Sequence, residues 1–197
     1  MPADALGNNI AAVGLPITGS LGFAPIGTLL PTPEEGSAPD FKLSAAFRKA
    51  GLFKEDGGFN WTLEADGDPI VFYQQGYSIP SGLANATLEV GLAQYDDIVR
   101  ELTWGKTPDE HGFITIDAGG HSTQFVIFTE EIFKNGVIRR RIAAVATVSA
   151  VALDQSTRGE VNGVTVTFKI EPSPLLANEH LGEWLLPPAA LTAPAAA

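Results

Sequence analysis

The stretch "GVTVTFKI", Gly163 to Ile170, has the most regular alternation of apolar and polar residues in the chain. In a strand, successive side chains point to opposite faces, so this order gives one apolar face and one polar face. The two sets are Val164, Val166, Phe168 and Ile170 on the apolar face and Thr165, Thr167 and Lys169 on the polar face. The pair Asn162-Gly163 at its start has the chemistry of a hairpin turn. The stretch predicts a β-strand in an antiparallel arrangement.

Other parts of the chain have strand-like patterns on both sides of this stretch. In "WTLEAD" (61–66) the residues alternate, "GD" follows as a turn, and "PIVFYQQ" (69–75) is expected to run back as the second half of a hairpin. The remaining expected strands are "ATLEVGLA" (86–93), "FITID" (113–117), "TQFVIFT" (123–129) and the long "GVIRRRIAAVATVSAVALD" (136–154). These patterns predict a mainly β fold.

One segment, "QYDDIVRELTWG" (94–105), has helical spacing instead. Its apolar residues fall at positions i, i+3, i+4 and i+7, and they are Tyr95, Ile98, Val99 and Leu102. Acidic residues in the first turn and Gly105 at the end are typical helix boundaries. We therefore expect a β-sandwich or partly closed barrel with one flanking α-helix.

The two ends of the chain differ in composition from the middle. Residues 1–40 are rich in Pro, Gly and Ala, and we expect them to form an N-terminal arm and linker. We expect residues 41–173 to form the β-sandwich domain. Residues 174–197 are expected to form a C-terminal arm, and its end is Ala/Pro-rich. The stretch "LGFAPIGTLLPTP" (21–33) is apolar but contains three prolines and two glycines. Prolines break helices and are excluded from central strands, so we expect this stretch to avoid regular structure.

Composition excludes several classes of protein. The 197 residues carry a formal net charge of −11, which argues against proteins that grip nucleic-acid phosphates or anionic membranes with a basic face. There are no cysteines, so disulfides and thiolate metal sites are excluded. No apolar run approaches the roughly 18–20 residues of a membrane span. We expect no secretory signal, because the N-terminus lacks a basic region.

The sequence contains no recognisable catalytic motif. Acidic and histidine residues gather in "DEHGFITIDAGGH" (109–121), where His111, Asp117 and His121 could bind a metal if strand ends brought them together. A solvated loop is the preferred interpretation, because the spacing matches no known metal motif. Pairs of adjacent acids, such as Glu130-Glu131, could form a glycosidase dyad but are better explained as surface residues. We therefore expect no enzyme activity, cofactor or metal.

Apolar residues in the arms suggest that the chain assembles with copies of itself. An arm that cannot bury its side chains alone can bury them on a neighbour, at roughly 25 cal/mol per Å². The only basic cluster, Arg139-Arg140-Arg141, is expected to pair with acids of a neighbouring strand or a neighbouring subunit, with Arg140 facing opposite to the other two. The candidate subunit contacts are Phe23, Pro25, Ile26, Leu29, Leu30, Glu55, Asp56, Arg139, Arg141 and Trp184.

Four motifs in this order resemble the major tail proteins, or tail tube subunits, of long-tailed phages that infect actinobacteria. They are Ala24–Thr28 with Pro31-Thr32, "GLFKEDG" (51–57), the strand and helix of 86–105, and the Arg-rich strand 137–142. The resemblance spans roughly residues 14–170, and the Ala/Pro-rich end departs from it. It implies a virion protein, assembled in the host cytoplasm, whose rings of six subunits stack into a tube through which double-stranded DNA passes.

The resemblance also implies partners, namely the tape measure, terminator and distal tail proteins, and no membrane. The loop 53–60 or the hairpin after Trp61 is expected to contribute to ring stacking. Two alternatives stay open. One is a tail terminator or head–tail joining protein of related fold, which would be present in about one ring rather than hundreds of copies. The other is a non-viral β-sandwich binding module, such as a carbohydrate-binding one, which would need an exposed aromatic platform.

Overall fold

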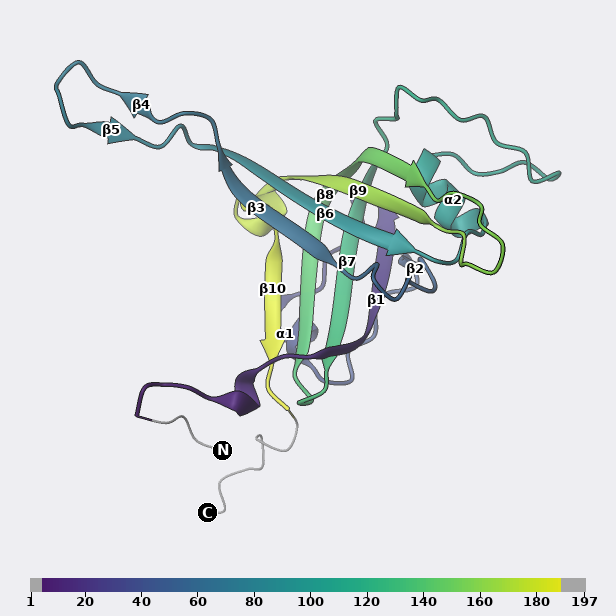
Figure 1. Cartoon of the computed structure of the whole chain (residues 1–197), viewed down its shortest axis with the longest axis horizontal. Coiled ribbons are helices and arrows are strands. Elements are labelled where there is room, and N and C mark those ends of the chain that lie inside the picture. The colour runs from purple at the N-terminus through teal and green to yellow at the C-terminus, as the bar shows by residue number, and fades with distance from the viewer. Residues whose placement is uncertain (1–4, 189–197) are drawn as a thin grey trace, which may run out of the picture.

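The structure, a computed structural model, describes residues 5–188 and is mainly β (Figure 1). One antiparallel sheet has the strand order β2-β1-β7-β8-β9-β6-β3, and β10 pairs with β8 outside this path. Two further strands, β4 and β5, pair with each other. The strands are β1 (Pro16–Pro25), β2 (Arg48–Lys49), β3 (Asn60–Asp66), β4 (Ile70–Val71), β5 (Ser78–Ile79), β6 (Leu83–Leu92), β7 (Gln124–Phe133), β8 (Ile138–Leu153), β9 (Val164–Glu171) and β10 (Gly182–Leu186). The helices are α1 (Pro33–Ser37), α2 (Asp97–Trp104) and the 3-10 turns η1 (Ile10–Ala12) and η2 (Pro174–Leu176).

The long strand β8 joins the two layers of the sandwich. Its first part pairs with β10 through Ile138–Ile142, and its later part pairs with β9 through Val145–Leu153. Register shifts interrupt its ladders with both β7 and β9, and such irregularities increase the local twist and bend. The sheet therefore curls over itself without closing, and β3, β6 and β9 cross in front of β7 and β8 (Figure 1). The predicted β-sandwich is confirmed.

The main core lies between the two layers and beneath α2. Side chains from β1, β6, β7, β8 and β9 meet there, and the rings of Phe23 and Phe125 make an edge-to-face contact at 5.7 Å. The apolar face predicted from "GVTVTFKI" is confirmed, because its four apolar residues are all fully buried. Burial of each such side chain contributes about 1.5–3 kcal/mol. A second, smaller cluster around Phe128 covers the outer face of β1, β7 and β8.

The predicted helix is confirmed as α2. Asp96 caps its N-terminus by accepting a hydrogen bond from the backbone N–H of Val99 at 2.9 Å. Gly105 ends it in the left-handed conformation with φ of 65°, which a residue without Cβ adopts freely. Val99 and Leu102 are buried against the core, so the helix closes one end of the space between the layers.

A paired carboxylate on α2 gives the fold a testable pH dependence. Glu101 accepts two hydrogen bonds from the Arg48 guanidinium, at 2.5 and 2.6 Å, and these bonds lower the pKa of Glu101 below its ordinary 4.5. A lowered folded-state pKa stabilises the fold above the unfolded pKa, and this stabilisation is lost as pH falls through the folded value. We expect Glu101→Gln to show a smaller loss of stability than the wild type between pH 5 and pH 3, measured by urea unfolding. Equal losses would contradict the assignment.

The expectation that Leu21–Pro33 avoids regular structure is wrong for its first part. Leu21–Pro25 form the end of β1, paired with β7 on one side and, at Gly22 and Phe23, with β2 on the other. Pro25 is tolerated because it is the last residue of the strand, where no further ladder bond is needed. The predicted arm of residues 1–40 thus contains a strand of the sheet. At the other end, β10 belongs to the sheet although it lies in the predicted C-terminal arm; the rest of that arm beyond residue 188 lies outside the described residues.

Two predicted strand arrangements are also wrong. Trp61–Asp66 do not pair with the residues that follow them, because β3 pairs with β6 along its whole length. The segment between them projects, and in it Ile70 pairs with Ile79 instead. "FITID" (113–117) forms no strand and lies in the loop between α2 and β7. The short α1 was not predicted, although Thr32 and Glu35 form a reciprocal capping box at its start.

Candidate assembly surfaces

The predicted contact residues of the N-terminal arm divide into buried and exposed groups. Phe23 is fully buried in the chain's own core, so the expectation that it contacts a neighbour is wrong. Leu30 is half-buried against the outer cluster. Pro25, Ile26 and Leu29 remain exposed at the turn after β1, with Leu29 88% exposed. This turn can therefore contact another molecule through Ile26 and Leu29.

Trp184 on β10 packs against its own chain rather than extending from it. Its indole N–H donates to the Pro33 carbonyl at 3.0 Å, and its ring lies 6.5 Å from that of Phe128. Gly36 of α1 lies so close to this ring that a Cβ would collide with it. α1 and β10 are thereby fixed together on the outer face of the sheet. Trp184 is only partly buried there, and its role as a subunit contact stays a prediction.

The three arginines pair with acids on neighbouring strands of the same chain, as one of the two predicted alternatives stated. Arg139 bonds Glu131 of β7 at 2.9 Å and Arg141 bonds Glu183 of β10 at 2.5 Å. Both guanidinium groups also lie near aromatic rings, Arg139 over Phe133 at 4.9 Å and Arg141 over Trp61 at 5.7 Å. Their charges are therefore already matched within the subunit.

Arg140 faces the opposite side and is 1% exposed. Its guanidinium donates to Glu130 at 2.7 Å and to the backbone carbonyls of Gly36, Ala38 and Pro39 at 2.8, 2.6 and 3.3 Å. It therefore ties the segment after α1 to the sheet by charge-assisted bonds, which are stronger than neutral ones. Sequence reasoning placed Arg140 on the opposite face but did not predict this role.

The segment between β3 and β6, residues 67–82, projects far from the body of the molecule (Figure 1). We call it the hairpin; in it β4 and β5 pair only with each other among the described strands. Its large apolar side chains are all exposed, and they are Ile70, Val71, Phe72, Tyr73, Tyr77 and Ile79. An isolated two-stranded hairpin is marginally stable in water. The hairpin therefore offers an apolar surface that residues 5–188 leave exposed.

The hairpin is also acidic. No lysine or arginine occurs between Lys54 and Arg100, whereas Asp66 and Asp68 lie exposed at the base of the hairpin. Sequence reasoning expected the region after Trp61 to take part in stacking but did not name the aromatic residues. The available signal was the uncharged stretch "FYQQGY" (72–77), which contains three aromatic residues and two of the three tyrosines of the chain.

The N-terminal segment before β1 forms a second exposed apolar surface. Its side chains Leu6, Ile10, Val13 and Leu15 are more than half exposed. The backbone is held to the turn between β7 and β8, where the Asn135 amide donates to the carbonyls of Ala11 and Val13. The sequence from residue 5 to residue 33 contains no charged residue, so this surface is apolar and uncharged.

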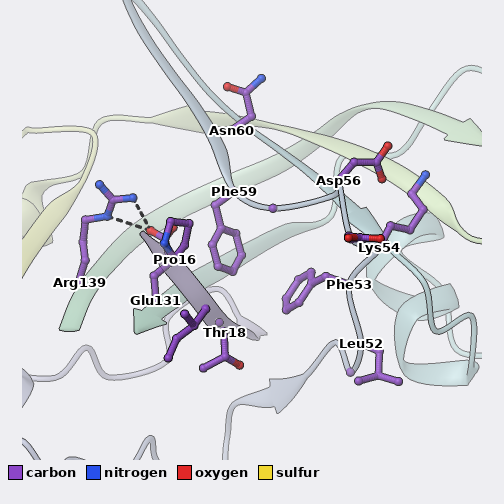
Figure 2. A pocket seen from close by; sticks show the side chains of 15 residues that line it. Pro16, Thr18, Leu52, Phe53, Lys54, Asp56, Phe59, Asn60, Glu131 and Arg139 are labelled. Atoms are coloured by element: carbon purple, nitrogen blue, oxygen red, sulfur yellow. Dashed lines mark hydrogen bonds and ion pairs between the residues drawn. The ribbon is translucent and has the colours of Figure 1, made fainter. Parts of the chain in front are cut away.

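A pocket of about 800 Å³ lies between the first half of β1 and the loop 51–60, and we call it the seam pocket (Figure 2). Figure 2 shows Phe53 and Phe59 close together at its floor, and their ring centroids are 5.2 Å apart. The predicted contact residues Glu55 and Asp56 line it, as does Lys54. Lys54 donates to Asp154 at 2.9 Å, which lowers the pKa of Asp154 below its ordinary 3.8. The uncompensated charge of the pocket is therefore negative.

A smaller pocket of about 330 Å³ lies on the outer face, beside the loop 41–47, and we call it the lysine groove. Its residues are Ser20, Phe41, Lys42, Leu43, Ser44, Ala45, Phe47, Lys49, Phe128 and Glu130. Lys42 and Lys49 are exposed and form no ion pair with residues 5–188. The single acid is already paired with Arg140. This groove combines apolar walls with two unpaired cations.

The loop between α2 and β7 holds the histidines considered as metal ligands. His121 lies against the end of α2, with Nε2 3.1 Å from the Thr103 carbonyl and Nδ1 accepting from the Thr123 N–H at 3.2 Å. Because Nδ1 accepts, Nε2 carries the proton. His111 is exposed, and the nearest acid to its Nε2 is Glu110 at 3.5 Å. No group of three potential ligands comes together in the described part of the chain.

Comparison of the chain with models of known protein families finds no match, and comparison with curated protein sequences finds none either. The described helices are all too short or too polar to cross a membrane. The candidate contact surfaces of the chain are the hairpin, the N-terminal segment, the seam pocket and the lysine groove.

Proposed function

We propose that this chain is a structural subunit that assembles with copies of itself into rings, and that the rings stack into the tail tube of a long-tailed phage. The observation that carries the proposal is the hairpin, which presents six large apolar side chains that stay exposed among the described residues 5–188. The resemblance of four ordered sequence motifs to tail tube subunits supports the same assignment.

Burial of the exposed apolar surface of the hairpin on a neighbouring copy would favour assembly. Contiguous exposed apolar patches on soluble proteins mark interaction sites. Burial of the hairpin on a neighbour would contribute roughly 25 cal/mol per Å² of apolar area. Packing of the hairpin on a different surface of the next copy would be a head-to-tail contact, and repeated head-to-tail contacts produce rings or filaments. The open edges of β2 and β3 would be covered in the same assembly.

The charge of the chain suits a tube that DNA passes through. Six copies would carry a formal charge of −66 (6 × −11). A wall with few unpaired cations avoids the phosphate contacts that would retain DNA. Under this proposal the protein belongs to the virion and contacts the tape measure, terminator and distal tail proteins at the ends of the tube.

Negative-stain electron microscopy of the purified protein tests the proposal. We expect rings with a central opening and stacks of such rings. Copy number then separates the tube subunit from a terminator or joining protein, because only the former forms long stacks. Uniform single-chain particles at every concentration would contradict the proposal.

A binding module is the second candidate, and one observation favours it. Phe72, Tyr73 and Tyr77 are exposed near the tip of the hairpin, and such rings can form the platform that a carbohydrate-binding module needs. Calorimetric titration with a panel of oligosaccharides distinguishes the two functions. Saturable binding that is lost in Tyr73→Ala, by a protein that stays monomeric, would favour the binding module over the tube subunit.

A further inference from the structure

We propose that the aromatic tip of the hairpin of one copy docks into the lysine groove of the next copy. The inference rests on the proposed self-assembly and names the two surfaces that would meet. The hairpin points away from the body, and β2, which borders the groove, lies on the other side of the body (Figure 1). A chain therefore cannot fill its own groove, and each copy has one free hairpin and one free groove.

Charge favours the lysine groove over the larger seam pocket. The hairpin carries Asp68 near its base and no cation, and Asp66, the last residue of β3, directly precedes it. The lysine groove provides Lys42 and Lys49, neither of which forms an ion pair with the described residues. Opposite charges across an interface steer association and fix its register, and like charges placed together cost several kcal/mol.

The seam pocket fails the same criterion. Glu55 and Asp56 line it, and its cations Lys54 and Arg139 are already paired with Asp154 and Glu131. An acidic hairpin entering it would meet uncompensated negative charge. The larger pocket is therefore the poorer receptor for the hairpin.

The lining of the groove also suits an aromatic side chain. Its walls include Phe41, Leu43, Phe47 and Phe128, which belong to the outer apolar cluster. Its volume of about 330 Å³ lies at the lower end of the range for ligand pockets. Asp68 lies four residues before Phe72, roughly 13 Å along an extended strand. A docked tip would thus leave this carboxylate near the rim, within reach of the long lysine side chains.

Disulfide trapping tests the contact directly, because the natural chain has no cysteine. One batch carries Tyr73→Cys and the other Ser44→Cys, and the two are mixed, assembled and oxidised. We expect a covalent dimer from this pair. The matched control pairs Tyr73→Cys with Leu52→Cys, which lies in the seam pocket and is also exposed, and we expect no dimer from it.

Assembled tubes that give no Ser44 dimer, or that give the Leu52 dimer instead, would overturn this inference and leave the tube proposal standing. A wild-type protein that forms no assembly would overturn both.

If the cysteine variants alone fail to assemble, charge-reversal variants test the docking instead. We expect Lys42→Glu/Lys49→Glu to lower assembly at least about tenfold, and Asp66→Lys/Asp68→Lys mixed with it to restore assembly. Arg158→Glu, an exposed reversal elsewhere, should change assembly little. A loss in Arg158→Glu as large as that in Lys42→Glu/Lys49→Glu, or no restoration in the mixture, would overturn the docking.

Discussion

Replacement of Arg140 by alanine is expected to lower the free energy of unfolding by about 3–5 kcal/mol. The guanidinium is 1% exposed and bonds Glu130 and the backbone carbonyls of Gly36, Ala38 and Pro39. Its removal leaves a half-buried carboxylate without its partner and several carbonyls without donors. The uncompensated groups cause the loss, because each buried polar group without a partner costs about 1–3 kcal/mol.

The matched control is Arg141→Ala on the same strand. Arg141 pairs with Glu183, whose side chain is 41% exposed, and exposed pairs contribute about 0–1 kcal/mol. Urea unfolding of both variants, followed by tryptophan fluorescence, measures the difference. Equal small losses in the two variants would show that Arg140 does not anchor the segment after α1. Arg140→Met/Glu130→Leu should recover part of the loss, since it removes both charges together.

Removal of the hairpin should abolish assembly while the fold is retained. Residues 69–79 can be replaced by a short Gly-Ser turn, because β4 and β5 pair only with each other and β3 already pairs with β6 on the body side. We expect the thermal midpoint to stay within a few degrees of the wild type and the assembled fraction to fall below detection. Circular dichroism and electron microscopy of the same samples measure these two quantities.

A triple substitution distinguishes the contribution of the aromatic side chains of the hairpin from that of its backbone. Phe72→Ser/Tyr73→Ser/Tyr77→Ser keeps the length of the projection but removes its aromatic surface. The control Leu153→Ser/Val161→Ser changes two other exposed apolar residues. We expect only the triple variant to lose assembly. Normal tubes formed by the protein without its hairpin would contradict the role given to the hairpin.

Local patterns in the sequence predicted the elements well. The alternation in 163–170 and the i, i+3, i+4, i+7 spacing in 95–102 both depend on neighbours within one element, and β9 and α2 occur where expected. For the three arginines, acids of a neighbouring strand and acids of a neighbouring subunit stayed open as partners, because the sequence does not show which strands are neighbours. The fold class followed from counting these elements.

Long-range pairing accounts for the errors. The partner of β3 is β6, which lies beyond the hairpin, and nothing in "WTLEAD" distinguishes the two pairings. β1 accepts an apolar stretch with a proline because Pro25 falls at its end, a position that depends on where β7 begins. The buried state of Phe23 and the packing of Trp184 on α1 depend on contacts across the sheet. Candidate contacts chosen by apolar character alone therefore mixed core residues with surface ones.

Sedimentation velocity of the purified wild-type protein over a hundredfold range of concentration shows whether the chain assembles with copies of itself. We expect the mass of the sedimenting species to rise with concentration from the 20.7 kDa single chain to rings and their stacks. A single species of 20.7 kDa at every concentration would contradict this expectation.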